Sequence, residues 1–597
     1  MSTSIDDQVA AVTKQYDEER NKRLREDGIT QYIDPSRSER FQHFQEDPWV
    51  DPSTIDDAGT KFPNNTCKIL IIGAGWGGLL YAIRMVEAGI PQEDIRIIDS
   101  AGGFGGTWYW NRYPGLMCDI ESYVYLPLLE QTGYIPKHRY SYGEEIRRYI
   151  NLVAQKWQLM ESAVFQTVAS VTGVLNGPKL PGIPGILDFK GDIFHSARFA
   201  YRLTGGSPED PSLWRLQDKR VAIIGTGATG VQLVPQLAQW AKHLYVVQRT
   251  PSAVDYRGQK ETDIKWFRES VAKISGWQEE RAKNFHEHFT IDEPPGINLV
   301  DDEWTRAPGL VGMAGNRNGP KSMEQVPGYM NQLAEVDLPR QERIRSRVDQ
   351  EVTDSAVAAK LKPWYPSWCK RPCFHDEYLK AFNRDNVTLV DTDGKGLRCI
   401  SADSIIAGET SYPVDLIILA TGYKAPAEGS PAERAGMSII GRNGVSMSEE
   451  WAQNGPATVH GILDQRFPNL FLCGPSQSSI SGSFTYVLDE LAKHCAYIVA
   501  EAERRADGKP CAIAATAEGS EPWGQQILMR ALPLTAVAGC TPGYYNLEGG
   551  MARLPPEKQL ALARGAPWGS DIGEFTQVLD AWRAEGGLCG MEVDLRG

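Results

Sequence analysis

The sequence lacks features that define several common classes of protein. No stretch reaches the roughly 20 consecutive apolar residues that a membrane-spanning helix needs. The 62 Lys and Arg residues are outnumbered by 76 Asp and Glu residues, giving a formal net charge of −14, which argues against a nucleic-acid-binding protein. Hydrophobic residues make up 42% of the 597 positions, so a wholly disordered or fibrous chain is also excluded.

Cysteine is scarce and irregularly spaced. The 10 cysteines form no C-x-x-C pair. Cys369 and Cys373 lie closest together but have no second pair beside them, so we expect no metal site. Residues 1–7 show neither the basic nor the apolar region of a signal peptide. We therefore expect a cytoplasmic protein with no membrane span, whose thiols are reduced and mostly buried.

The apolar pattern predicts an α/β fold with two Rossmann-like dinucleotide-binding domains and a helical insertion. Short buried strands alternate with helical stretches, and a charge-rich helical region interrupts this alternation once. The expected parts are an N-terminal helical arm (1–66), the first part of one dinucleotide-binding domain (67–198), a second dinucleotide-binding domain (199–380) with its helical insertion (about 263–361), and a return to the first domain followed by a Gly- and Pro-rich tail (381–597).

The first glycine motif has a complete nucleotide-binding context. Gly73, Gly75 and Gly78 follow the apolar strand 67–72 and precede a helical stretch. Such glycines allow a tight turn, a close approach of the backbone to a pyrophosphate, and close helix packing, while the helix N-terminus attracts the anion. Asp99 ends the next strand about 20 residues later, where a carboxylate can accept hydrogen bonds from ribose hydroxyls. This unit is predicted to bind FAD.

A second glycine motif points to a phosphorylated coenzyme. Gly225, Gly227 and Gly230 follow the strand 221–224, and the next strand ends at Arg249, in the position where an NAD site needs an acid. A guanidinium can donate two parallel hydrogen bonds to a phosphate, which favours the 2′-phosphate of NADP as the ligand. The alternative is a surface arginine near a turn. Together the two motifs predict an FAD-containing, NADPH-dependent oxidoreductase.

Two longer signatures resemble those of the type I Baeyer–Villiger monooxygenases. The second of them, F-x-G-x-x-x-H-x-x-x-W, runs from Phe189 to Phe199, with Phe199 in place of the final Trp. The resemblance extends over about residues 67–545, and the tail sequence 540–546 resembles the fungal branch that accepts large substrates. The first signature lies in residues 102–119, where the matching residues are Gly106, Trp108, Tyr113, Pro114, Gly115 and Asp119.

The resemblance implies a reaction. In this family NADPH reduces FAD, O₂ adds at flavin C4a, and the C4a-peroxyflavin inserts one oxygen atom next to a ketone carbonyl to give an ester or lactone. We therefore expect FAD and NADPH as cofactors, with O₂ and a bulky or polycyclic secondary-metabolite ketone as substrates. No metal and no nucleic acid are expected, and no pattern indicates an oligomeric state.

The family pattern also assigns roles to residues. Arg371 matches the arginine that stabilises the oxygen anion, because a guanidinium stays protonated throughout. Asp119 matches the carboxylate that holds this arginine, Lys370 is expected to join Arg249 at the 2′-phosphate, and His195 matches a linker residue rather than an acid or base. The expected cofactor-binding residues are Gly73, Gly75, Trp76, Gly78, Asp99, Gly106, Thr107, Trp108, Asp119, Tyr125, Gly225, Thr226, Gly227, Thr229, Gly230, Arg249, Thr250 and Lys370.

Three further expectations concern the surroundings of the flavin. Trp108 and Tyr113 are either part of a flavin wall or ordinary core aromatics. The segments 416–423 and 471–475 resemble places where flavin enzymes recross between domains. A helix predicted from Tyr486 has an N-terminal end that could face the flavin ring.

One departure from the family leaves alternatives open. An antiparallel meander is expected after Phe165, but only a short segment, near 167–173, is present there, and its loss would expose sheet edges. An inactive nucleotide-binding relative is therefore one alternative. A flavin monooxygenase that oxygenates nitrogen or sulfur is another. A disulfide reductase is disfavoured because no C-x-x-C is present to relay electrons.

Overall fold

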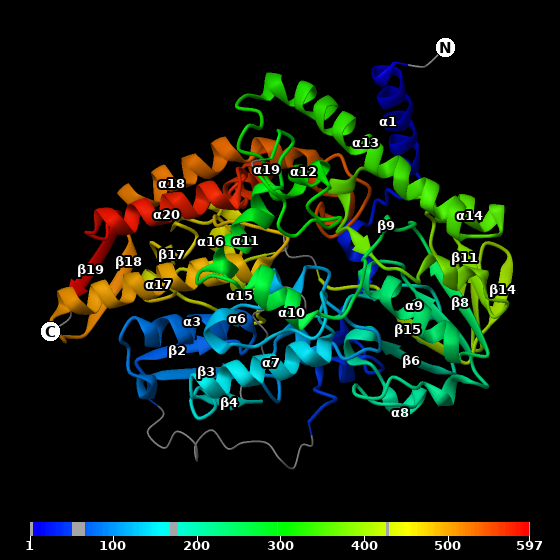
Figure 1. Ribbon diagram of the computed structural model, residues 1–597, viewed down its shortest axis with the longest axis horizontal. Coiled ribbons are helices and arrows are strands. Elements are labelled where there is room, and N and C mark those ends of the chain that lie inside the picture. Colours follow the sequence, from blue (N-terminus) through cyan, green and yellow to red (C-terminus); the bar gives the residue numbers. More distant parts are fainter. Residues whose placement is uncertain (1–3, 51–65, 167–176, 295, 425–428, 596–597) are drawn as a thin grey trace.

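The structure is a computed structural model of the chain. It describes residues 4–50, 66–166, 177–294, 296–424 and 429–595. Two parallel sheets, each with its own hydrophobic core, form two lobes side by side (Figure 1). The predicted α/β class with two Rossmann-like units is confirmed. No helix in the described part of the chain is long and apolar enough to cross a membrane.

The first lobe is built around the first glycine motif. Its sheet pairs β2 (Ile69–Ile72), β3 (Ile95–Asp99) and β4 (Ala163–Phe165) in parallel, with β3 in the centre. Helix α3 (Trp76–Glu87) leaves β2 through the glycine turn and packs against α17 (Phe484–Ala506). Because α3 lies between the sheet and α17, its apolar residues are buried on more than one face.

The second lobe is built around the second glycine motif. Helix α9 (Ala228–Trp240) follows the motif and covers the sheet. The sheet is parallel throughout, in the order β11-β8-β7-β15-β6. Its strands are β6 (Asp192–His195), β7 (Arg220–Ile224), β8 (His243–Gln248), β11 (Val387–Asp391) and β15 (Leu416–Leu419).

Three strands of this second sheet lie outside the range 199–380 that the sequence analysis gave to it. β6 precedes that range, and β11 and β15 follow it, yet all three pair with other strands of the sheet. The boundaries at 198/199 and 380/381 are therefore wrong for these strands. A short buried apolar run has the same pattern in either sheet, so sequence order alone does not assign it.

The insertion lies within the second lobe's part of the chain, between β8 and β11, and one long helix dominates it. Helix α13 (Val326–Glu351) runs across the molecule, and α1 (Ile5–Asn21) of the N-terminal arm packs on it through Val9 and Val12 (Figure 1). The other helices of the insertion are α10 (Ile264–Trp266) with the π-helical turn Phe267–Val271, α11 (Trp277–Glu287), α12 (Val311–Ala314) and α14 (Ser355–Leu361).

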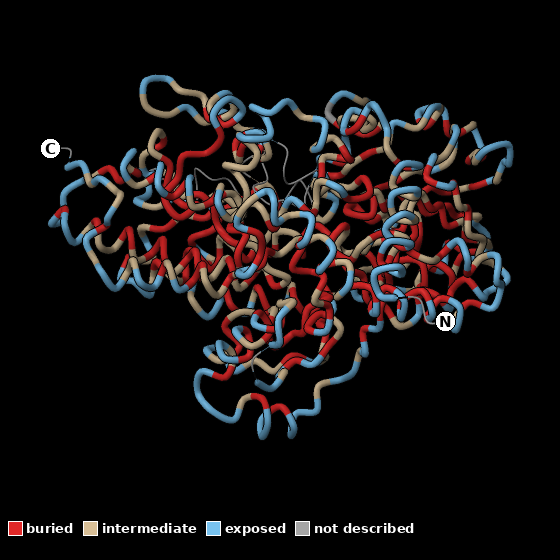
Figure 2. The backbone as a smooth tube through the Cα atoms, turned by 90° about the horizontal axis from the view of Figure 1, so that it is seen from above, coloured by how far each residue is buried: buried red, intermediate tan, exposed pale blue. Residues whose placement is uncertain are grey.

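The C-terminal part packs on the first lobe, and one of its segments, residues 540–550, reaches the cavity between the lobes. Buried residues, drawn in red, lie in the interior, and exposed residues, drawn in pale blue, lie mostly at the edges of the molecule (Figure 2). We call residues 540–550 the tail segment. The elements that precede it in the chain are β18 (Cys511–Ala515) and α18 (Ala517–Arg530). Those that follow it are α19 (Pro556–Arg564), α20 (Ile572–Glu585) and β19 (Met591–Leu595), which pairs with β18 in antiparallel fashion.

The remaining α-helices and β-strands of the described chain are mostly short. They are the helices α4 (Thr107–Trp110), α5 (Ser122–Tyr125), α6 (Leu129–Thr132), α7 (Gly143–Lys156), α8 (Tyr201–Thr204), α15 (Pro431–Arg434) and α16 (Met447–Asn454), the antiparallel meander β12 (Cys399–Ile400), β13 (Ser404–Ala407) and β14 (Thr410–Pro413), and the two-stranded pairs β1 (Tyr32–Ile33) with β5 (Leu180–Pro181), β9 (Val254–Asp255) with β10 (Cys373–Phe374), and β16 (Thr458–Val459) with β17 (Leu463–Asp464).

Candidate active site

A cavity of about 1900 Å³ lies between the two lobes. Single small-molecule sites are usually ~300–1,000 Å³, so this space can take more than one ligand. Both glycine turns, Arg371 and the N-terminal end of α17 line it. The cavity brings together every residue that the sequence analysis named for cofactor binding or catalysis except Gly230.

In the first glycine turn, backbone atoms pack so closely that two of the glycines leave no room for a side chain. Gly73 has a φ of 113°, in the region that favours glycine. A Cβ on Gly78 would lie 1.8 Å from the Gly73 carbonyl oxygen, and one on Gly106 would lie 2.8 Å from the Gly75 Cα. The Asp99 carboxylate accepts the Ala74 N–H at 2.6 Å and so holds the turn. The turn therefore presents bare backbone beside the N-terminus of α3, which suits a pyrophosphate.

The second turn repeats this construction. Gly225 has a φ of 110°, and a Cβ on Gly230 would lie 2.3 Å from the Gly225 carbonyl oxygen. Gly230 thus serves the turn rather than the cavity. The Thr226 hydroxyl donates to the Thr250 carbonyl at 3.0 Å, which connects the turn to the end of β8. Both glycine motifs predicted from the sequence therefore form the same kind of tight turn between a strand and a helix.

Positive charge gathers where β8 ends. Lys179, Arg249 and Lys370 surround the buried carboxylate of Glu548, and we call these three the cation cluster. Glu548 lies 2.8 Å from the Lys179 ammonium and 3.4 Å from the Arg249 guanidinium. Burial and the neighbouring cations lower the pKa of Lys370 to about 8, although Glu548 opposes this shift. Arg249 and Lys370 lie together, as the sequence analysis expected for a 2′-phosphate site.

The predicted catalytic pair is in contact range. Arg371 Nε lies 3.7 Å from a carboxylate oxygen of Asp119, and Asp119 is 6% exposed. The Arg371 side chain faces the cavity, so it keeps 39% of its accessible area although protein surrounds it. Burial lowers the pKa of Arg371, but Asp119 and the nearby tyrosines outweigh burial, and the net pKa is raised. The guanidinium therefore remains a permanent cation at the cavity wall.

A second arginine, Arg257, holds Asp119 from the other side. Its guanidinium lies 2.5 Å from the Asp119 carboxylate and also donates to the Cys118 carbonyl at 2.6 Å and the Phe374 carbonyl at 3.1 Å. Asp119 therefore lies between two guanidinium groups, and its orientation does not depend on Arg371 alone. Arg257 could not be predicted from the sequence, because no motif distinguishes it.

Known proteins resemble this chain over almost its full length. The profile "Flavin-binding monooxygenase-like" matches residues 148–263, and "NAD(P)-binding Rossmann-like domain" matches residues 71–132. The FAD-binding monooxygenase prhK of Penicillium brasilianum is 43% identical, over 98% of this chain and 96% of that protein. The polycyclic ketone monooxygenase of Thermothelomyces thermophilus is 40% identical, over 98% of this chain and 97% of that protein.

Solved structures agree with this result. The structure of the Thermothelomyces polycyclic ketone monooxygenase superimposes with a TM-score of 0.94 at 39% identity, over 99% of this chain and 100% of that one. The chain belongs to the type I Baeyer–Villiger monooxygenases. A steroid monooxygenase bound to NADP gives a TM-score of 0.68 at 25% identity, over 89% of this chain and 100% of that one. The protein is thus an FAD-containing, NADPH-dependent monooxygenase, and the family predicted from its two signatures is confirmed.

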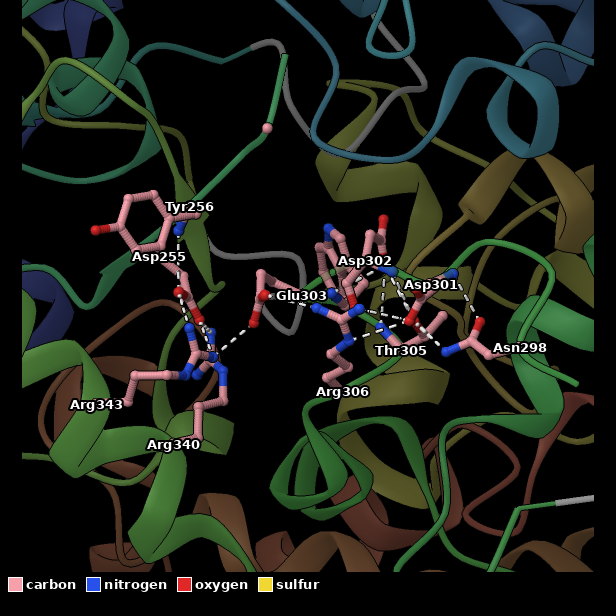
Figure 3. A network of polar contacts seen from close by, with 12 residues as sticks. Asp255, Tyr256, Asn298, Asp301, Asp302, Glu303, Thr305, Arg306, Arg340 and Arg343 are labelled. Atoms are coloured by element: carbon pink, nitrogen blue, oxygen red, sulfur yellow. Dashed lines mark hydrogen bonds and ion pairs between the residues drawn. The ribbon is translucent and has the colours of Figure 1, made fainter. Parts of the chain in front are cut away.

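In this monooxygenase, the helical insertion supports the Asp119 region. The Trp304 indole N–H donates to the Asp119 carbonyl at 2.9 Å, and the Arg371 guanidinium lies 5.7 Å from the Trp304 ring centre. Figure 3 shows how the loop carrying Trp304 is tied to α13, through Arg343, which bridges Asp255 at 2.7 Å and Glu303 at 2.6 Å. The insertion therefore positions one wall beside Arg371 and Asp119, a role that its charge-rich sequence did not reveal.

The two signature aromatics have different positions. The Trp108 indole donates to the Tyr125 hydroxyl at 2.8 Å, and both residues line the cavity. Tyr113 also reaches the cavity, but its hydroxyl donates to Gln232 on α9 at 2.9 Å, and its ring belongs to the core of the second lobe. Tyr113 is thus an aromatic contact between the lobes as well as part of the cavity wall.

His195 ends β6 and is fully buried. Its Nδ1 accepts the Ala197 N–H at 3.1 Å. Burial lowers the pKa of His195 to about 3, so the imidazole is neutral at physiological pH. This agrees with a structural role at the junction of the lobes, and no proton transfer is assigned to it.

One cysteine pair corrects the expectation of reduced thiols. Cys369 and Cys540 form a disulfide that joins positions 171 residues apart. The bond connects the residue before Lys370 to the first residue of the tail segment. That segment carries Tyr544 and Tyr545, which line the cavity near Arg371. The pair was missed because so long a separation leaves no spacing signal, and such a bond is uncommon in a reducing compartment. The shortened segment near 167–173 lies outside the described residues.

Proposed function

We propose that this monooxygenase inserts one oxygen atom of O₂ next to the carbonyl of a bulky, polycyclic ketone, with Arg371 and Asp119 as its catalytic residues. The observation that carries the proposal is the Arg371–Asp119 pair in a large cavity that both nucleotide-binding turns also line. The similarity to a polycyclic ketone monooxygenase over nearly the full chain supports the substrate class.

The first glycine turn would hold the FAD pyrophosphate, and Asp99 would lie beside its ribose. The fit rests on the backbone cradle at Gly73 and Gly78, where a side chain would collide. FAD supplies the reduction of O₂ and the transfer of oxygen when it is bound. The chain contributes the rest: Arg371 provides a permanent cation where negative charge develops, Asp119 orients it, and the surrounding aromatic walls exclude water.

The second turn and the cation cluster would hold NADP. Arg249→Ala is expected to lower the preference for NADPH over NADH by roughly 10- to 100-fold, because a charge-assisted bond to the 2′-phosphate would be lost. The measurement is the ratio of kcat/KM for the two coenzymes, with each rate monitored as the oxidation of NADPH or NADH. Arg220→Ala is the matched control, since Arg220 pairs with Asp415 at 2.7 Å away from the cavity. An unchanged preference in Arg249→Ala would place the 2′-phosphate elsewhere.

The reaction itself is tested with purified, FAD-loaded enzyme, NADPH and a panel of polycyclic ketones, together with matched amines and thioethers. An ester or lactone one oxygen heavier than the ketone is the expected product, formed as NADPH is consumed. Exclusive N- or S-oxidation would support the alternative oxygenase. A protein that binds NADPH but never oxidises it would support the inactive relative.

A further inference from the structure

Glu548 is a buried carboxylate that neither the family signatures nor the catalytic pair uses. Its side chain is 3% exposed and lies 2.8 Å from Lys179 and 3.4 Å from Arg249. It is also the main group that favours the charged form of Lys370. One carboxylate is therefore shared by all three members of the cation cluster, at the place proposed for the coenzyme phosphate.

The backbone holds Glu548 in an unfavourable conformation. Leu547 and Glu548 both have a φ of 54°, in the left-handed region that such side chains seldom adopt. The preceding Asn546 stabilises this turn, because its side-chain oxygen accepts the Gly543 and Gly549 N–H groups, each at 3.0 Å. The tail segment is thus built to direct this carboxylate at the cation cluster, at a conformational cost.

The charges of this cluster do not balance. Glu548 offers one negative charge to Lys179, Arg249 and Lys370, which leaves an excess of two positive charges. Arg23, a further cation that acts on Lys370, already pairs with Glu19 at 2.6 Å. A phosphate monoester carries about −1.5 to −2 at neutral pH, so these cations attract it more strongly than they attract a single carboxylate. Once that phosphate arrives, the Glu548 carboxylate becomes a like charge in the same site.

We propose that Glu548 is a specificity-determining residue whose carboxylate competes with the 2′-phosphate of NADP for the cation cluster and is displaced when that phosphate binds. The inference rests on the proposed position of the 2′-phosphate at Arg249. A coenzyme without this phosphate cannot displace Glu548, so the tail segment keeps its resting position. Tyr544 and Tyr545, which belong to the same segment, then also stay in place beside Arg371.

The test uses probes that differ only in the phosphate. Adenosine 2′,5′-bisphosphate and 5′-AMP are titrated calorimetrically into the FAD-loaded wild type and into Glu548→Gln. The bisphosphate is expected to bind Glu548→Gln about tenfold more tightly than it binds the wild type, because the repulsion is gone. The affinity for 5′-AMP is expected to change less than about twofold. Bisphosphate affinity that stays unchanged or falls in Glu548→Gln overturns the proposal.

Controls separate this inference from the proposed function. Glu377→Gln removes a carboxylate that pairs with Lys380 at 2.8 Å outside the cavity, and should bind both probes as the wild type does. If Arg249→Ala does not weaken bisphosphate binding, the proposed phosphate position fails. If Arg249→Ala weakens it but Glu548→Gln does not strengthen it, only the role of Glu548 fails.

A measurement on the wild type decides the matter if Glu548→Gln does not fold. Hydrogen exchange of residues 543–550 is compared at saturating bisphosphate and at saturating 5′-AMP. Displacement of Glu548 should break the turn held by Asn546 and increase exchange of the Gly549 amide with the bisphosphate alone. Identical exchange with both probes overturns the proposal.

Discussion

Arg371→Ala is expected to reduce ester formation by at least about 100-fold while FAD is still reduced by NADPH at close to the wild-type rate. The removed guanidinium lines the cavity 3.7 Å from Asp119, and loss of one preorganised charge-stabilising group typically costs ~10²–10³-fold in rate. Reduction needs only coenzyme and flavin, so it does not depend on this cation. Anaerobic stopped-flow absorbance measures the reduction, and mass spectrometry of the product measures the ester.

Two variants make this result specific. Arg371→Lys keeps a positive charge but loses the planar guanidinium with its paired N–H donors, and should retain part of the activity. Arg442→Ala removes an arginine that pairs with Glu592 at 2.6 Å, and should oxygenate normally. Because Arg257 still holds Asp119, the loss in Arg371→Ala would not come from a displaced carboxylate. Ester formation at the wild-type rate in Arg371→Ala would contradict the assignment.

Gly78→Ala is expected to yield protein with at most about a tenth of the normal flavin content. The added methyl would lie 1.8 Å from the Gly73 carbonyl oxygen, so either the turn or α3 must shift. A shift at this contact opens the backbone cradle on which the pyrophosphate depends. The ratio of flavin absorbance to protein absorbance in the purified variant measures the effect.

Gly328→Ala is the matched control for this change. Gly328 lies in α13, and a Cβ built there has no atom within 4 Å. The same substitution should therefore leave both the flavin content and the melting temperature near those of the wild type. A fully flavinated Gly78→Ala protein would mean that the first turn does not carry the FAD.

The sequence was informative where function depends on residues close together in the chain. The turns at Gly73 and Gly225 follow from local patterns, since a glycine spacing between a strand and a helix determines a backbone path within a few residues. Arg249 could be located in the same way, because it ends the strand after its motif. Arg371 and Asp119 carry no local signal of their own, and only the family signatures brought them together.

The sequence was uninformative where contacts join distant positions. Arg249 and Glu548 are 299 residues apart, and no periodicity or motif connects them. Arg257 and Trp304 hold Asp119 from the second lobe and the insertion, so their roles exist only after folding. The assignment of β11 and β15 failed for the same reason. Strand pairing is a tertiary property, and an apolar run shows only that a strand is buried.

The Cys369–Cys540 bond has a consequence for handling the enzyme. In the chain-entropy treatment, a cross-link between positions 171 residues apart removes unfolded-state freedom equivalent to about 5 kcal/mol. One end of the bond precedes the Lys370-Arg371 pair, so this tether acts where the guanidinium must stay aligned. Both cysteines are buried, so the thiol reductants that are routine in purification buffers would break the bond only when the surrounding packing opens. Preparations kept under oxidising conditions should therefore contain the more heat-resistant and more uniformly active enzyme.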